Sequence, residues 1–388
     1  FEGPLLATKN INKIGHFTDW VIGHVHLGAL GWNGFMAFGV IYYLVPIMWR
    51  TKLWSVKLAN WHFWLGTLGI IFYAVPMYFA GFTQSLMWKD FTPDGVLKYP
   101  NFLETVVQIV PMYRLRAFGG SLYLIGVLVM VYNLWKTAAA GKFVANEETS
   151  APALEKLTVE PKGHWHRWIE RRPVQMLLLS LIVILIGGMI EIIPMLTIKS
   201  NIPTISSVKP YTPLELQGRD IYIREGCYTC HSQMIRPFRS ETERYGEYSK
   251  AGEFVYDHPF QWGSKRTGPD LAREGHKYPN SWHYNHMMDP TTMSPGSIMP
   301  AYDFLITDDL DTSLTGAKIN VMRKLGVPYD NDFASIANRE LMKQGNMISK
   351  DLAKSGIKVA PNKEIVALIA YLQRLGVDIK GEKITSNK

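Results

Sequence analysis

Four long uncharged stretches place the strongest constraint on how this chain of 388 residues can fold. They cover residues 20–49, 58–88, 117–135 and 174–198, and Glu191 in the fourth is the only charged residue within them. A helix that crosses the hydrocarbon core of a bilayer needs about 20 apolar residues, and tryptophan and tyrosine favour its two interfaces. Because Trp or Tyr marks many of the ends, we predict four transmembrane helices.

The basic residues of the loops predict the orientation of these helices. The loop after the first stretch carries Arg50, Lys52 and Lys57 without an acid, and residues 136–172 are also rich in lysine and arginine. Cytoplasmic loops of membrane proteins carry this excess. We therefore expect residues 1–16 and 199–388 on the outer face. The net charge of +8 gathers beside the apolar stretches, so we expect contact with membrane lipid and not with nucleic acid.

The 2 cysteines of the chain lie together in Cys227-Tyr228-Thr229-Cys230-His231. Two thiols separated by two residues and followed by histidine form the attachment pattern of a c-type haem. Cys227 and Cys230 would bind the vinyl groups, and His231 would coordinate the iron. A zinc site or a thioredoxin-like redox pair stays open, although zinc would need two further ligands and a redox pair does not need the histidine.

Two histidines, His24 and His26, lie in the first apolar stretch. Residues two apart on a helix point roughly 200° apart, so these imidazoles cannot share one metal but could each hold a large cofactor. Histidine inside a membrane is costly and tends to be functional, although hydrogen bonds to neighbouring helices would also explain the pair. Arg114 and Arg116 precede the third stretch at a similar depth. They could bind carboxylates such as haem propionates, or anchor the helix among lipid headgroups.

Several motifs resemble one family of respiratory enzymes. Asp19-Trp20, Gly23-His24-Val25-His26 and the following residues 28–32 are similar to a late helix of the catalytic subunit of haem–copper oxidases, most closely the C-family, or cbb-type, cytochrome c oxidases. Residues 63–88 and 116–135 resemble the next two helices. Residues 173–388 resemble the monohaem cytochrome c subunit of the same enzyme.

The resemblance implies a mainly α protein that fuses two subunits. Residues 1–137 would form the last three transmembrane helices of subunit I, and residues 138–172 a cytoplasmic linker. Residues 173–198 would form the transmembrane anchor of subunit II, and residues 199–388 a class I cytochrome c domain in the periplasm. The implied location is the inner membrane of a bacterium.

The resemblance also implies roles for single residues. His24 would bind the iron of a high-spin haem b, and His26 that of a low-spin haem b. Glu2 matches an acidic position of the family and would hydrogen-bond near the proximal imidazole and make it more basic, unless it is a solvated acid. Met299 matches the ligand loop of the cytochrome subunit, so we predict it as the sixth ligand of haem c.

Other sixth ligands stay open for haem c. Met raises the redox potential of such a centre, and Pro300 would stiffen the loop that carries Met299. The alternatives, with Met293 next in order, are Met234, Met287, Met288 and Met293. We expect His276, His283 and His286 on the surface or in hydrogen bonds, although ligation by two histidines stays open.

The family's copper ligands, its active-site tyrosine and the second low-spin ligand belong to earlier helices and do not occur in this chain. Because the sequence opens at Phe1 and not at Met, we expect an upstream part of subunit I to supply them, in the same chain or as a separate polypeptide. The two b haems would then be shared with that part, which would also hold the copper.

The implied function is that of part of a respiratory terminal cytochrome c oxidase. A further cytochrome c subunit or a soluble cytochrome c would reduce haem c. Electrons would then pass through the low-spin and high-spin b haems to reduce oxygen to water, with proton translocation. The alternatives are a nitric oxide reductase of the same superfamily and a membrane-anchored cytochrome c without its own catalytic site.

Overall fold

The computed structural model describes residues 1–145, 165–198 and 204–380. These residues contain helices and three isolated β-bridges, but no strand. Residues 1–143 and 206–388 form one compact unit, and residues 144–205 form another. The mainly α fold predicted from the sequence is confirmed.

Four helices are long and apolar enough to cross a membrane, as predicted. The first, Asp19–Met48, is composite: α3 (Asp19–His26) continues through a π-helical segment, η1 (Leu27–Gly34), into α4 (Phe35–Met48). The wider turns of a π-helix displace carbonyl groups from the regular hydrogen-bond ladder. Here the Tyr123 hydroxyl donates to the Leu30 carbonyl over 2.9 Å. The remaining three are α5 (Val56–Lys89), α6 (Phe102–Ala140) and α8 (Pro173–Thr197).

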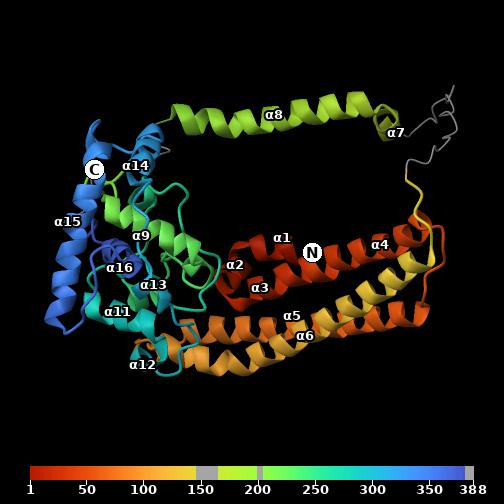
Figure 1. Cartoon of the computed structure of the whole chain (residues 1–388), viewed down its shortest axis with the longest axis horizontal. Helices are drawn as coiled ribbons and strands as arrows, with labels where there is room; N and C mark the ends of the chain where they lie inside the picture. The colour runs from red at the N-terminus through yellow and green to blue at the C-terminus, as the bar shows by residue number, and fades with distance from the viewer. Residues whose placement is uncertain (146–164, 199–203, 381–388) are drawn as a thin grey trace. The chain divides into compact units, whose positions relative to one another are not determined.

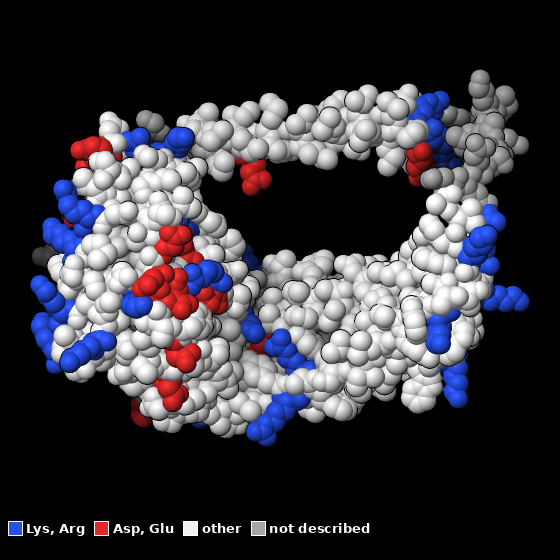
Figure 2. Space-filling view, viewed as in Figure 1, with Lys and Arg blue, Asp and Glu red and all other residues white. Residues whose placement is uncertain are grey.

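Helices α5 and α6 cross with their backbones in contact (Figure 1). A Cβ atom added to Gly119 would lie 2.6 Å from the Gly69 carbonyl oxygen, so only glycine fits at the crossing. Small residues permit this close approach between membrane helices, where packing and not the hydrophobic effect holds the helices together. Figure 2 shows an uncharged surface along this part of the unit, with lysine and arginine at the end where the chain turns from α4 into α5.

Helix α6 is longer than the sequence stretch 117–135 that predicted it. Its 39 residues span about 58 Å, whereas the hydrocarbon core is about 30 Å thick. Glu104, Arg114 and Arg116 interrupt the apolar run but not the helix. The first turns of α6 therefore extend beyond a bilayer, and Val106 and Ile109 in these turns are buried.

The described part of the predicted cytochrome domain, called the cytochrome domain below, is built on two crossing helices, α9 (Pro213–Arg224) and α16 (Glu364–Arg374). Helix α9 starts with a capping box, in which the Thr212 side chain accepts from the Glu215 amide and the Glu215 carboxylate accepts from the Thr212 amide. The contact between α9 and α16 forms the centre of the domain core, which includes Leu214, Ile221, Tyr222, Ile365, Leu368, Ile369 and Leu372. The helical spacing of Ile365, Leu368, Ile369 and Leu372 predicts a helix over residues 364–375, and α16 confirms it. Residues 308–326 read as one polar helix, but the helix there is confined to α14 (Thr315–Lys324).

The other described helices of the main unit are short, except α15. They are α1 (Glu2–Ala7), α2 (Lys9–Gly15), α10 (Arg239–Tyr245), α11 (Asn280–Met288), α12 (Pro290–Met293), α13 (Phe304–Thr307) and α15 (Phe333–Lys354), with 3-10 turns at Cys227–Thr229 and Ala251–Phe254. In the second unit, α7 (Trp165–Glu170) precedes α8. Most of the predicted linker, residues 146–164, lies outside the described residues.

Candidate functional site

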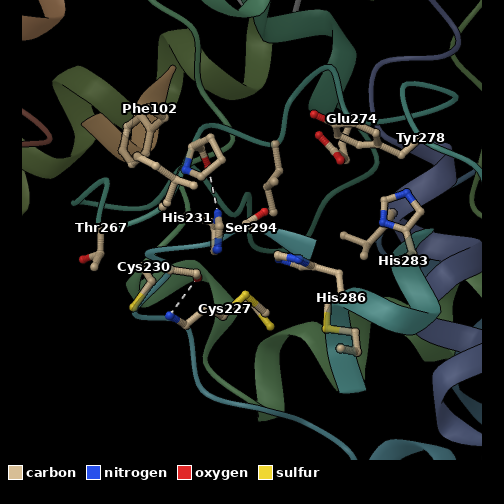
Figure 3. Close-up of a pocket in the computed structure, with 18 of the residues that line it drawn as sticks. Phe102, Cys227, Cys230, His231, Thr267, Glu274, Tyr278, His283, His286 and Ser294 are labelled. Carbon is tan, nitrogen blue, oxygen red and sulfur yellow. Dashed lines mark hydrogen bonds between the residues drawn. The ribbon is translucent and has the colours of Figure 1, made fainter. Parts of the chain in front are cut away.

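A cavity of about 450 Å³ lies beside the Cys227–His231 motif (Figure 3). Cys227, Cys230 and His231 line it from the turn after α9, and Met299 lines it from the loop after α12. The structure thus brings together the four residues that the sequence assigned to haem c.

The His231 ring is oriented for ligation by its second nitrogen. Its Nδ1 donates to the Pro269 carbonyl over 2.8 Å, which leaves Nε2 for an iron atom. Burial lowers the pKa of His231, so the ring is neutral, which is the form that coordinates metals. A Cβ atom on Gly268 would lie 2.2 Å from Cε1 of this ring, so the loop that supports the ring requires glycine there.

The Cys227 thiol is poorly suited to redox chemistry, and the described residues around the motif offer no zinc site. Both are free, and burial, together with the nearby Glu225 carboxylate, raises the pKa of Cys227 to about 12. Redox-active C-x-x-C pairs depend on a lowered thiol pKa. In the described part of the chain, no group of three His, Cys, Asp or Glu residues could hold a metal ion. Free thiols beside an oriented imidazole and a large cavity fit covalent attachment of a haem.

The cavity narrows the choice of a sixth ligand. Met299 and Met287 line it, whereas Met234, Met288 and Met293 do not. The Met299 amide donates to the Ser297 hydroxyl over 3.2 Å, which orders the ligand loop. Met299 as the sixth ligand stays a prediction. The alternative methionine that also lines the cavity is Met287 and not Met293.

The expectation of surface or hydrogen-bonded histidines is wrong for His283. This residue is 1% exposed, and its Nε2 has no hydrogen-bond partner. His286 is half-buried, stacks on Trp282 with ring centroids 4.5 Å apart, and lines the cavity with His283. The reason is that α11 turns one face toward the cavity, whereas His276 is exposed as expected.

His24 and Glu2 are in direct contact. The His24 Nδ1 lies 3.1 Å from Glu2 Oε2, and the Glu2 carboxylate also accepts from Trp20 Nε1 and the Tyr78 hydroxyl, each over 2.9 Å. Burial tends to raise the pKa of Glu2, but these three donors outweigh burial and lower it. Glu2 is therefore an ionised acceptor and not a solvated acid.

His26 points to a different set of neighbours. Its Nδ1 donates to the Ile22 carbonyl over 2.9 Å, and its ring lies 4.6 Å from that of Tyr73 in α5. Arg116 covers the same Tyr73 ring at 5.0 Å, whereas Arg114 is exposed. Both histidines thus use Nδ1 in a hydrogen bond, as metal-bound histidines commonly do. Arg116 thus contacts the neighbour of a predicted haem ligand.

A buried network around Asp19 was missed by the sequence reasoning. Asp19 is fully buried, and its Oδ2 accepts from Gln84 Nε2 over 2.8 Å and from the Tyr113 hydroxyl over 2.7 Å. Lys265 of the cytochrome domain lies 3.8 Å from the other oxygen. The motif Asp19-Trp20 was the only signal, because the partners lie far away in the sequence.

Comparison with known families divides the chain in two. The family model described as "Cytochrome C oxidase, mono-heme subunit/FixO" matches residues 166–379. This match covers more than half of the chain and includes Cys227, Cys230, His231 and Met299.

The chain belongs to the mono-haem FixO family. Residues 1–122 match a second model, "Cytochrome C and Quinol oxidase polypeptide I". The chain therefore joins the end of an oxidase subunit I to a FixO subunit, in the order that the sequence predicted.

Curated relatives of this FixO-family chain resemble its N-terminal part. "Cytochrome c oxidase subunit 1 homolog, bacteroid" of Bradyrhizobium diazoefficiens is 53% identical over 143 residues, which are 37% of this chain and 26% of the relative. "Cytochrome c oxidase subunit 1" of Rhodobacter capsulatus is 49% identical over 154 residues, 39% and 29% of the two chains. "Cbb3-type cytochrome c oxidase subunit CcoN1" of Stutzerimonas stutzeri is 44% identical over 143 residues, 37% and 30%. The chain thus spans less than a third of the length of these relatives.

Proposed function

We propose that this chain carries electrons into the oxygen-reducing centre of a terminal cytochrome c oxidase. The observation that carries the proposal is that one compact unit contains both the cavity beside Cys227 and the helix with His24 and His26. An external cytochrome c, as a further subunit or a soluble protein, would be the donor. Oxygen would be reduced to water with translocation of protons, as the resemblance to haem–copper oxidases implies.

At the outer site, Cys227 and Cys230 would form thioethers with haem c, and His231 and Met299 would bind its iron. A haem held in this way supplies reversible transfer of single electrons. The bond from His231 to the Pro269 carbonyl orients the ligand, and the cavity walls would shield the haem from water. A methionine ligand would favour the reduced iron and so raise the potential.

At the membrane site, His24 would bind a high-spin haem b and His26 a low-spin haem b. Glu2 would hold the Nδ1 proton of His24 and make that imidazole a stronger donor, because a carboxylate partner raises ligand basicity. Arg116, and by its sequence position Arg114, would pair with haem propionates. An upstream part of subunit I would supply the copper ligands and the second low-spin ligand.

Two other functions remain candidates. A nitric oxide reductase would share the His24 and His26 arrangement but, in its usual form, has its cytochrome before or apart from the catalytic part. A non-catalytic anchored cytochrome would use α3 to α6 only as a scaffold. Measuring whether the assembled enzyme consumes oxygen or nitric oxide separates the oxidase from the nitric oxide reductase. Haem content tests the anchored cytochrome, which would contain haem c without haem b.

The experiment is a pyridine haemochrome analysis of the chain purified together with its upstream part. We expect covalent haem c and extractable haem b in the same preparation. Replacing Cys227 and Cys230 by alanine should remove the covalent haem and leave haem b. In the same preparation, Glu2→Gln should raise the potential of the high-spin haem b, because a weaker donor ligand stabilises the oxidised iron less. Haem c without any haem b would contradict the oxidase.

A further inference from the structure

The wall of the cavity beside Cys227 is not built by the cytochrome domain alone. The residues before α6 and its first turns also line it, with Pro100, Asn101, Phe102, Leu103 and Val106. Figure 3 shows Phe102 near His231 and Cys230, on a different ribbon from the haem motif. The membrane part therefore contributes apolar side chains to the same cavity as the ligands.

Arginines of the cytochrome domain hold this wall in place. Arg244 Nη1 donates to the Tyr99 carbonyl over 2.7 Å and to the Pro100 carbonyl over 2.9 Å, and its Nη2 lies 3.4 Å from the Trp88 carbonyl. Arg239 donates to the Gly95 carbonyl in the same loop. These forked donors bind the main chain just before α6, so they fix where the helix begins relative to the cavity.

The side chains of the wall are themselves packed. The ring of Phe102 stacks on that of Trp88, with centroids 5.7 Å apart and planes at 26°. Val106 is 3% exposed. A Cβ atom on Gly296, three residues before Met299, would lie 3.3 Å from Val107, so the ligand loop also approaches α6. The wall is therefore fixed on both sides of the cavity.

We propose that the haem c site is a composite one, in which the first turns of α6 cover the haem on the side of the membrane part. The proposal rests on the assignment of Cys227, Cys230 and His231 to haem c. Solvent exposure is one of the levers that set the potential of a haem, because water stabilises the charged, oxidised iron. Phe102, Leu103 and Val106 would therefore raise the potential of haem c by excluding water from this side.

The same helix leads from the cavity to the predicted low-spin site. Leu103 lines the cavity and Arg116 lies over Tyr73, which contacts His26. At 1.5 Å per residue these two positions on α6 are about 20 Å apart. With its wall at the start of α6, haem c would lie at one end of a continuous helix whose Arg116 contacts Tyr73, the neighbour of His26. The donor cytochrome would approach haem c from another side.

The test is Phe102→Ala in the full chain with its upstream part, measured by redox titration of haem c. We expect covalent haem c at the wild-type level, a shift of its midpoint potential to lower values, and a severalfold slower electron equilibration between haem c and haem b after flash photolysis. Arg244→Ala should shift both quantities in the same direction, because it releases the start of α6. The matched control is Phe118→Ala on the same helix, whose side chain is 52% exposed and outside the cavity.

An unchanged potential and an unchanged equilibration rate in Phe102→Ala would overturn the composite site. If Phe102→Ala does not accumulate, Phe102→Leu keeps most of the packing and should give a smaller shift in the same direction, and no shift would again contradict the proposal. Failure of the proposed function is distinguishable, because the wild-type preparation would then lack either the covalent haem c or the extractable haem b.

Discussion

Glu274 is a buried carboxyl group in the lining of the cavity beside Cys227. It is 5% exposed, and burial raises its pKa to about 7, although Lys277 and Lys380 partly offset this effect. A raised pKa means that the folded state prefers the protonated form. Stability is therefore fully present below the unfolded pKa of about 4.5 and decreases as the pH rises toward about 7.

Glu274→Gln should remove this pH dependence. The difference between the two pKa values corresponds to roughly 3 kcal/mol at high pH, as an upper limit. We expect the variant to unfold at a higher temperature than the wild type at pH 8.5, with a difference that shrinks toward pH 5. Thermal unfolding, followed by the absorbance of haem c, measures this difference in unfolding temperature. Glu243→Gln, on the exposed face of α10, is the control and should show no such trend. A constant difference across this pH range would contradict the expectation.

Single residues were predictable where their neighbours in the sequence determine their chemistry. Cys227, Cys230 and His231 form a local motif, and the structure adds the cavity and the Pro269 bond around them. Asp19 and Phe17 were not predictable in this way. Phe17 is fully buried under Arg266 of the cytochrome domain, at 4.2 Å from the guanidinium to the ring. Only the folded chain brings such distant residues together.

Helices α9 and α16 meet at a glycine. A Cβ atom on Gly218 would lie 1.9 Å from the Ala367 carbonyl oxygen, which belongs to a helix backbone and cannot rotate away. Gly218→Ala should therefore force the two helices apart and destabilise the cytochrome domain by about 1–3 kcal/mol or more, as overpacking does. The control is Gly39→Ala in α4, where a Cβ atom would meet nothing within 4 Å. Urea unfolding of the haem c absorbance measures the effect, and equal midpoints for Gly218→Ala and wild type would refute the close crossing.

Helix existence followed from the sequence more readily than helix length. The apolar runs predicted each membrane helix because a single long uncharged segment crosses the hydrocarbon core of a bilayer as a helix, which satisfies its own backbone hydrogen bonds. The first turns of α6 escaped this reasoning because Glu104, Arg114 and Arg116 interrupt the apolar run, and because Phe102, Leu103 and Val106 line a cavity with the cytochrome domain. The capping box at Thr212 was predictable because its partners are three residues apart. The π-helical segment after His26 accepts a hydrogen bond from Tyr123 of another helix, a contact that no local pattern reveals.

The two ends of the membrane part differ in charge and in contacts. Arg50, Lys52 and Lys57 lie between α4 and α5, at the end away from the cytochrome domain, whereas the carbonyl groups of Trp88, Tyr99 and Pro100 at the other end bind Arg244 of that domain. Because both ends belong to one compact unit, the side of the membrane on which one end lies determines the side of the other. The excess of basic residues should keep its end in the cytoplasm, so the cytochrome domain should face outward.

Reporter fusions test this orientation in whole cells. Alkaline phosphatase is active only outside the cytoplasm, whereas green fluorescent protein matures in the cytoplasm and poorly outside it. A phosphatase fused after Lys388 should be active, and one fused to a chain ending at Lys142 should be inactive, with the opposite result for the fluorescent protein. Replacing Arg50, Lys52 and Lys57 by glutamine should weaken the difference, because these residues carry the orientation signal. An active phosphatase at Lys142 with an inactive one at Lys388 would place the haem motif in the cytoplasm, where a c-type haem could not be attached by the outer-face machinery that the proposed function requires.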